Sequence, residues 1–580
     1  MILNDRNRVF TLILAALLVF FCAGNAAAKG GSDKSSKKSG LDNDKDTVNS
    51  LSAPDQASGS LSEEIRNLTE TGILSSMLSA LELIRSRELG NTEFGRLMSA
   101  FNVMFIKLVY PDSPAVLPAV DLPQTSAYTR IIREAEKGVY VQPPSDSNDF
   151  YEHILTFFVV NDQTTPEILA NLLKNMEKAG NLRPKSVLPP FFMGLIHERA
   201  GRYREAEASF NKAYQISSEC YSAQIGIARI RRFSGNTSEA VSLFNELALR
   251  FPDSKEIRRQ LAISYFANNE LNRALSAVDE ILRADPRDGD FLLLRASILI
   301  EQVHFSQANS SLDTYASINP NNRTYLYLRA RVQAEGNRNR DSALNYLRSI
   351  LRANPNDVQA MVYTANLLME SQKPEEQTEG RELLTRLQQS AGNSVDVLSL
   401  SLRDAVKRER WQEAQGYLNR ILTSRRTVHD LQDGYTVERG LGNNARALSY
   451  ARELYERDTS NNDYTVVFIS ALIDNNRREE ASRLIESRIN SVGSGAVKSR
   501  FFFLRSRLQT NQDSALGDLR SSLFEDPRNL DALISMFELY HNRREERRAV
   551  HYLRQALAIA PEHPHLKRYE REYASLLGRN

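Results

Sequence analysis

Apolar and polar residues alternate along most of this chain with the spacing of amphipathic helices. In three segments, a turn-prone residue stands five positions before an alanine, and a large apolar residue follows that alanine by four positions. Residues four apart lie on one face of a helix, so each segment predicts a helix with a buried stripe. The segments are 200–214, 234–248 and 268–282, and their alanines, Ala206, Ala240 and Ala274, lie 34 residues apart. This spacing predicts a repeated structural unit.

The alanine recurs almost to the carboxyl end of the chain. Between Ala343 and Ala414 one slightly long repeat places Gly380 where the alanine would stand. The register predicts eleven repeats from about Val187 onward. The marking alanines are Ala206, Ala240, Ala274, Ala308, Ala343, Ala414, Ala447, Ala481, Ala515 and Ala549, and prolines follow twelve positions later at Pro252, Pro286, Pro320, Pro355, Pro527 and Pro561.

The chemistry of these positions explains the pattern. Small residues at repeat positions 8 and 20 let two helices approach closely, where a larger side chain would force them apart. The proline lacks an N–H group and ends the second helix. One helical hairpin cannot bury its apolar face alone, whereas stacked hairpins bury a continuous core. We therefore predict an all-α fold over residues 187–580: an α-solenoid, a right-handed superhelix of stacked helix pairs.

The repeat resembles the tetratricopeptide repeat (TPR). The shared features are the 34-residue period, Gly or Ala at position 8, Ala at 20, a large apolar residue at 24 and Pro at 32. Repeats 6 to 9 depart from this pattern; the segment "HDLQDGYTVERGLGNNARALSYARELYERDT" lacks the closing proline, so we expect irregular helix packing or a bend there. The related pentatricopeptide repeats read single-stranded RNA and have a 35-residue period, which argues against them here.

The amino terminus has the pattern of a secretory signal peptide. Arg6 and Arg8 precede thirteen residues, 9–21, of which only Thr11 is polar, and small residues follow up to Ala28. Thirteen helical residues reach only about 20 Å, less than the ~30 Å hydrocarbon core of a membrane. We expect cleavage after Ala28 and export to the periplasm or cell envelope. An uncleaved membrane anchor and lipidation at Cys22 are the alternatives, and membrane contact is expected only in those two cases.

Two further regions precede the repeats. Residues 29–60 are mainly Gly, Ser, Lys and Asp and predict a disordered polar tether, because they cannot bury enough apolar surface to fold. Residues 61–186 have apolar residues at helical spacing, interrupted by proline-containing loops. We predict an irregular helical cap domain there, with room for one or two degenerate repeats.

Catalytic motifs are absent from the sequence. It contains no glycine-rich nucleotide loop, zinc-protease motif or nucleophile elbow. His563 and His565 flank Pro564 without a nearby third metal ligand. With 74 basic and 72 acidic residues, the net charge of +2 gives no general attraction for nucleic acid. We therefore predict no catalysis, cofactor, metal, nucleic-acid partner or small-molecule substrate.

The resemblance implies an exported interaction scaffold that binds a partner protein or extended peptide in a concave groove, with cell-envelope assembly or secretion as its setting. Two alternatives stay open: an enzyme or enzyme accessory protein whose active part is 61–186, with the repeats recruiting substrate, and a membrane-tethered structural spacer. A fold alone does not decide between them.

Groove residues follow from the resemblance, because positions 2, 5, 9 and 12 of each first helix line the groove in that family. From residue 187 onward the chain has 49 Arg and 6 Lys. Lys is missing at the places where the family's two-carboxylate clamp of Lys, Asn and Arg has it, so that clamp is not reproduced. We expect contacts to an extended, partly acidic segment; the alternative is that these arginines are only solvated. The predicted groove residues are Phe191, Arg229, Arg232, Arg259, Tyr327, Arg331, Asn366 and Arg403.

Overall fold

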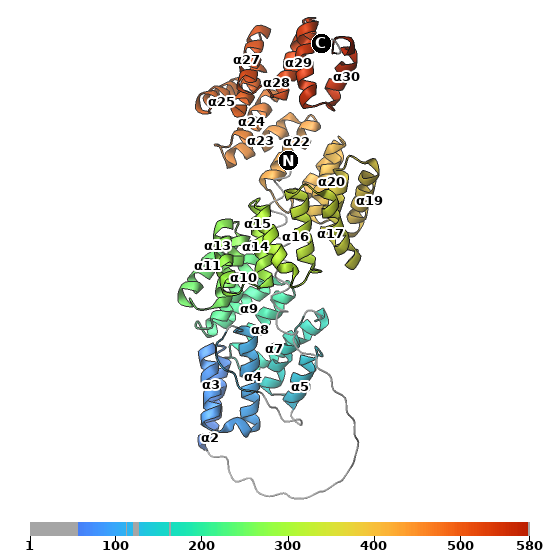
Figure 1. Ribbon diagram of the computed structural model, residues 1–580. Helices are drawn as coiled ribbons and strands as arrows, with labels where there is room; N and C mark the ends of the chain where they lie inside the picture. The colour runs from blue at the N-terminus through green and yellow to red at the C-terminus, as the bar shows by residue number, and fades with distance from the viewer. Residues whose placement is uncertain (1–55, 112, 120–126, 162–163, 578–580) are drawn as a thin grey trace. The chain divides into compact units, whose positions relative to one another are not determined.

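The computed structural model describes residues 56–111, 113–119, 127–161 and 164–577 (Figure 1). All regular elements in these residues are helical, and none of them is a strand, which confirms the predicted all-α class of stacked helix pairs. The predicted signal peptide, 1–28, and residues 29–55 of the predicted tether lie outside the described residues. Helix α2 begins at Gln56, so the tether boundary predicted at residue 60 is wrong by five residues.

The chain divides into two compact units, which we call the N-terminal unit, ending at Ala353, and the C-terminal unit, beginning at Asn354. Through the described residues, eleven helix pairs follow one another between Leu188 and Ile559. The first five pairs belong to the N-terminal unit and the other six to the C-terminal unit.

Residues 56–182 form an irregular group of helices. Polar side chains fix where its helices start: Thr92 accepts a hydrogen bond from the Gly95 N–H group at the start of α4, and Asp149 accepts two at the start of α6. The elements are α2 (Gln56–Glu70), α3 (Leu74–Ser86), η1 (Leu89–Asn91), α4 (Glu93–Val109), α5 (Ala127–Glu136), α6 (Phe150–Leu155), η2 (Thr156–Val159) and α7 (Pro166–Leu182).

Aromatic side chains join this group to the first repeat. Phe192 of the first repeat stacks on Phe157, with ring centroids 4.2 Å apart, and meets Phe105 edge-on at 5.7 Å. All three side chains are buried. The apolar face of the first repeat is therefore covered by the preceding helices through large rings, which contribute more buried area than any other side chains.

Five helix pairs complete the N-terminal unit. In each pair, the first helix is followed by a tight turn and a second helix that packs back on it. The pairs are α8 (Leu188–Arg199) with α9 (Tyr203–Ile216), α10 (Tyr221–Phe233) with α11 (Thr237–Arg250), α12 (Lys255–Ala267) with α13 (Leu271–Ala284), α14 (Gly289–Glu301) with α15 (Phe305–Ala316), and α16 (Arg323–Arg331), continued by η3 (Val332–Gly336), with α17 (Arg340–Ala353).

Six pairs and two short terminal helices make up the C-terminal unit. The pairs are α18 (Val358–Met369) with α19 (Pro374–Ala391), α20 (Val395–Lys407) with α21 (Trp411–Leu422), α22 (Val428–Gly440) with α23 (Asn444–Arg457), α24 (Asn462–Asp474) with α25 (Arg478–Ser491), α26 (Ala496–Ser506) with α27 (Gln512–Glu525), and α28 (Leu530–Asn542) with α29 (Glu546–Ile559). Helices α30 (Pro564–Glu572) and α31 (Ala574–Leu577) follow them.

Small residues occupy the close contacts within the pairs. The marking alanine is buried at nine of its ten places and half-buried at Ala515. A Cβ atom added to Gly194 would lie 2.6 Å from the Phe210 ring, and one added to Gly226 would lie 2.8 Å from the same ring. The ring of Phe210 therefore fits between two helices only because both opposing residues lack a side chain.

The turn inside most pairs contains one residue in the left-handed conformation. This residue lets the chain reverse between the first and second helix, and only some repeats use glycine for it. Val303 is notable because a β-branched residue at a φ of +65° is sterically strained. The left-handed residues of these turns are Gly201, Gly235, Asn269, Val303, Arg338, Glu409, Gly442, Asn476 and Arg544.

Candidate functional site

Phe191 does not lie on an open groove. It is 3% exposed and packs against Phe105 and Phe210, with ring centroids 5.8 and 5.9 Å away. The prediction that Phe191 faces a ligand is therefore wrong, because the helices before the first repeat cover this position and turn it into core.

Arg229 and Arg232 on α10 contact the first helices of the repeats on either side. Arg229 makes a bidentate contact with Glu198 of α8, with its Nε and Nη2 atoms 2.9 and 2.6 Å from the carboxylate oxygens. Arg232 donates to the Gln260 side chain at 2.9 Å and to Ser264 at 3.1 Å, both on α12. Arg232 is 2% exposed; burial, together with the charge of Arg229, lowers the pKa of its guanidinium to about 9.

Arg259 and Arg331 repeat this arrangement further along the N-terminal unit. Arg259 pairs with Asp288, the residue that caps α14, and lies over the Phe291 ring. Arg331 on α16 pairs with Glu301 of α14 at 2.8 Å, and both side chains are buried. Burial would lower the pKa of Arg331, but nearby carboxylates outweigh burial and hold that pKa well above its usual value.

The three remaining predicted residues are Tyr327, Asn366 and Arg403. Tyr327 is 5% exposed, so its side chain is largely withdrawn from solvent. Arg403 on α20 donates to the side-chain oxygen of Asn366 on α18, and both residues are half-buried. Four of the eight predicted residues are therefore half-buried: Arg229, Arg259, Asn366 and Arg403.

Sequence reasoning missed the partners of these arginines. Glu198 precedes Arg229 by 31 residues and Glu301 precedes Arg331 by 30, so opposite charges stand nearly one repeat apart on successive first helices. In the C-terminal unit, Asp474 of α24 likewise receives Arg439 at 3.2 Å and Arg507 at 2.8 Å from the repeats on either side. A search for opposite charges at this separation could have found the pairs.

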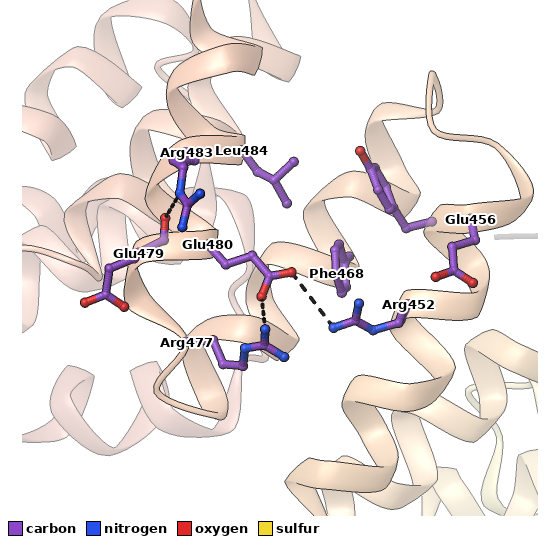
Figure 2. A pocket seen from close by; sticks show the side chains of 9 residues that line it. Arg452, Glu456, Phe468, Arg477, Glu479, Glu480, Arg483 and Leu484 are labelled. Atoms are coloured by element: carbon purple, nitrogen blue, oxygen red, sulfur yellow. Dashed lines mark hydrogen bonds and ion pairs between the residues drawn. The ribbon is translucent and has the colours of Figure 1, made fainter.

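A cavity of about 610 Å³ lies in the C-terminal unit between two second helices, α23 and α25 (Figure 2). Its lining combines aromatic, aliphatic, basic and acidic side chains. The cavity falls in repeats 8 and 9, where the closing proline is missing from the sequence. The lining residues are Arg452, Tyr455, Glu456, Phe468, Arg477, Glu479, Glu480, Arg483 and Leu484.

Two of the arginines hold one glutamate in this cavity. Figure 2 shows the Glu480 carboxylate between the guanidinium groups of Arg477 and Arg452, at 2.5 and 3.9 Å. Arg452 also lies 5.3 Å from the centroid of the Phe468 ring, which stacks on Tyr455 at 5.0 Å. The cavity therefore has an aromatic wall beside a cluster of guanidinium groups.

No group of three or more His, Cys, Asp or Glu side chains in the described residues could hold a metal ion. In 61–186, burial raises the pKa of Glu70 to about 7. The Glu70 side chain is only 8% exposed, however, and its carboxyl contacts Tyr151 at 3.2 Å and Arg183 at 3.0 Å. A buried carboxyl held by two such side chains is typical of a structural contact between packed helices. None of the helices that the structure describes has the length and apolarity needed to cross a membrane.

Comparison with known proteins identifies the repeat. Tetratricopeptide repeat family models match residues 199–262, 234–298 and 327–391. The human protein O-mannosyl-transferase TMTC1 is 24% identical over 132 residues, which are 22% of this chain and 15% of TMTC1. The chain thus spans only a small part of that relative, and the activity in its name belongs to that protein.

Solved structures with similar folds were also found. The Cut9 and Hcn1 hetero-tetramer of the APC/C has a chain that is 12% identical, with 86% of this chain and 93% of that chain covered and a TM-score of 0.49. The TPR protein TTC0263 of Thermus thermophilus is 21% identical, with 32% of this chain and all of that chain covered and a TM-score of 0.29.

The repeat register, the stacked helix pairs and the family matches agree. Residues 199–298 and 327–391 of this chain are therefore tetratricopeptide repeats, within a longer series of stacked helix pairs. Its helix pairs form a scaffold for protein–protein interaction.

Proposed function

We propose that this protein is an exported, non-catalytic scaffold that holds an extended segment of a partner protein along its first helices, in cell-envelope assembly or secretion. The observation that carries the proposal is the state of Arg229, Arg259 and Arg403. Each is half-buried and is held by a side chain of a neighbouring repeat. Groups that are already oriented lose little conformational entropy when a partner binds.

The partner segment is partly acidic in this proposal. A guanidinium group has five N–H donors, so an arginine that holds one carboxylate can still donate to a second acceptor. Arg229 uses its Nε and Nη2 atoms for Glu198. The buried members of the predicted set, among them Arg232 and Arg331, fix the spacing of the first helices and make no ligand contact.

The export part of the proposal rests on the amino-terminal sequence. Its test is sequencing of the mature protein from the native host, in which we expect Lys29 as the first residue. An intact Met1, or a lipid-modified Cys22, would contradict cleavage after Ala28.

The binding part is tested with a partner captured by cross-linking from envelope extracts. Arg229, Arg259 and Arg403 are changed together to Gln, and we expect affinity for that partner to fall at least tenfold. A matched variant changes Arg283, Arg352 and Arg386, exposed arginines of second helices, to Gln. Melting temperatures of both variants separate loss of binding from loss of folding. Equal affinity of the two variants would place the binding surface elsewhere.

A further inference from the structure

The cavity between α23 and α25 has one apolar side. Phe468, which is 3% exposed, forms part of its wall together with the stacked ring of Tyr455, and Leu484 lines it from α25. In Figure 2, Leu484 extends from α25 into the space that Phe468 borders. Tyr455 and Leu484 are half-buried, so part of each side chain faces the cavity and can contact an apolar side chain of a ligand.

The other side of the cavity carries three guanidinium groups. Arg477 and Arg452 share the carboxylate of Glu480, at 2.5 and 3.9 Å. Arg483 is exposed and donates from its Nε atom to the backbone carbonyl of Glu479 on its own helix, at a long 3.4 Å. The Nη groups of Arg483 can therefore donate hydrogen bonds to the carboxylate of a ligand at little cost to the fold.

The carboxylates of the lining do not neutralise these groups equally. Glu480 lies between two of the arginines, whereas Glu456 and Glu479 are exposed, and Figure 2 shows the Glu479 side chain directed away from Phe468. The lining therefore has three guanidinium groups and three carboxylates, but only Glu480 is held between arginines of the cavity. A carboxylate of a ligand would form charge-assisted hydrogen bonds with Arg483, whose side chain makes one long internal contact.

We propose that this cavity is a second binding site, which takes a segment of a partner protein that presents a carboxylate beside a large apolar side chain. The carboxylate binds Arg483 and Arg477, and the apolar side chain lies against Tyr455 and Leu484. A volume of about 610 Å³ is within the range of pockets that bind compact ligands, and it admits a few residues of an extended chain. The site uses side chains of α23, α24 and α25 and none of Arg229, Arg259 and Arg403, so it does not depend on the first-helix residues proposed above.

The test uses the full mature chain and the fluorescein-labelled peptide Gly-Ser-Asp-Phe-Ser-Gly, followed by fluorescence anisotropy. We expect saturable binding of this peptide. Replacing its Asp by Asn, or its Phe by Gly, should weaken binding at least tenfold, because each change removes one half of the recognition. Equal binding of all three peptides would overturn the proposal.

Protein variants locate the bound peptide. Arg483→Gln should weaken binding at least fivefold, whereas Arg386→Gln, an exposed arginine on α19, should leave binding unchanged. Glu480→Gln should tighten binding at least threefold, because it releases Arg477 and Arg452 from their internal carboxylate. Glu375→Gln on α19 changes the net charge equally and should have no effect.

Two results would contradict the assignment: an Arg483→Gln variant that binds like Arg386→Gln, and a Glu480→Gln variant that binds no tighter than Glu375→Gln. The triple variant of Arg229, Arg259 and Arg403 should bind the peptide normally. The proposal for the second site is therefore tested independently of the proposal for the first-helix surface.

Discussion

In the N-terminal unit, the pair that Arg331 forms with Glu301 is buried, with side-chain exposures of 6% and 3%. In the C-terminal unit, Arg500 and Asp463 also join two successive first helices, yet their side chains are 40% and 71% exposed. Both pairs join an arginine to a carboxylate of the preceding first helix. The Arg331 pair lies at the carboxyl ends of its helices and is enclosed, whereas the Arg500 pair lies near the amino ends of its helices and is open to solvent.

The hydrophobic cores differ in the same direction. In the N-terminal unit, one large cluster of buried residues extends from Ile65 to Ile230 and a second one from Val241 to Val332, with a small third cluster around Phe244 between them. The C-terminal unit has smaller clusters around repeats 7, 9 and 11, and it contains the cavity of Figure 2. The repeat motif fixes the helix pair; the side chains between its marked positions decide how tightly neighbouring pairs close.

The largest expected difference comes from removing one partner of each ion pair. Glu301→Gln leaves the buried Arg331 with Glu335 alone, and we expect a loss of about 3 kcal/mol of local stability, because an undercompensated buried charge is costly. Asp463→Asn should cost less than about 1 kcal/mol, since water already solvates that pair. Hydrogen exchange of α14 and α24 measures both losses. Equal losses of stability in the two variants would contradict the contrast between the buried and the exposed ion pair.

Two buried carboxylates predict opposite pH responses in the two units. Burial raises the pKa of Glu70 from 4.5 to about 7. The folded state then binds the proton of Glu70 more tightly than the unfolded state does. The resulting stabilisation of the folded state is at most about 3 kcal/mol; it is complete below about pH 4.5 and is lost as the pH rises through about 7. Hydrogen exchange of α2, corrected for intrinsic rates, measures the loss, and Glu70→Gln should abolish it.

Asp430 in the C-terminal unit has the opposite sign. Burial alone would raise the pKa of Asp430, but hydrogen bonds from Thr427 and the Arg425 guanidinium outweigh burial and lower it from 3.8. Its stabilisation is present above pH 3.8 and is lost as the pH falls through the folded value. Exchange of α22 should therefore accelerate in acid where exchange of α2 does not. If hydrogen exchange of α2 and α22 changed with pH in the same direction, the environments described for Glu70 and Asp430 would be wrong.

Glycine substitutions test packing at single positions. Gly194→Ala should cost about 1–3 kcal/mol, because the added Cβ would lie 2.6 Å from the Phe210 ring. Gly517→Ala on α27 has no atom within 4 Å of the added Cβ and should stabilise that helix by up to about 1 kcal/mol, since alanine favours helix. Urea unfolding of both variants measures whether each substitution lowers or raises the free energy of unfolding. A stabilised Gly194→Ala protein would show that the pair is not closely packed there.

The smallest expected effect is at the strained turn of the fourth repeat. Val303→Gly should raise local stability by about 1 kcal/mol, because glycine adopts a φ of +65° without the clash that a β-branched side chain suffers. Asn476→Gly, at the equivalent turn in the C-terminal unit, should change stability by only a few tenths of a kcal/mol, since asparagine tolerates this conformation. Thermal unfolding of both variants measures the difference, and a destabilised Val303→Gly protein would contradict it.

The sequence by itself determined the helix pairs. The alanine spacing, the turn residues and the closing prolines act within one pair, over distances of a few residues, and their consequences are local. The structure accordingly buries Ala206 and Ala274 and places Gly201 and Asn269 in left-handed turns. The sequence also indicated which first-helix positions carry arginine, although not what those arginines contact.

Only the tertiary structure decided the roles of the remaining residues. Phe191 became core because helices outside the repeats cover it, and Arg331 became buried because Glu301 reaches it from the preceding repeat. The cavity needs side chains from α23, α24 and α25 at once. Each of these outcomes depends on the distance between neighbouring helix pairs, which is set by the summed packing of many side chains, and no single repeat encodes that distance.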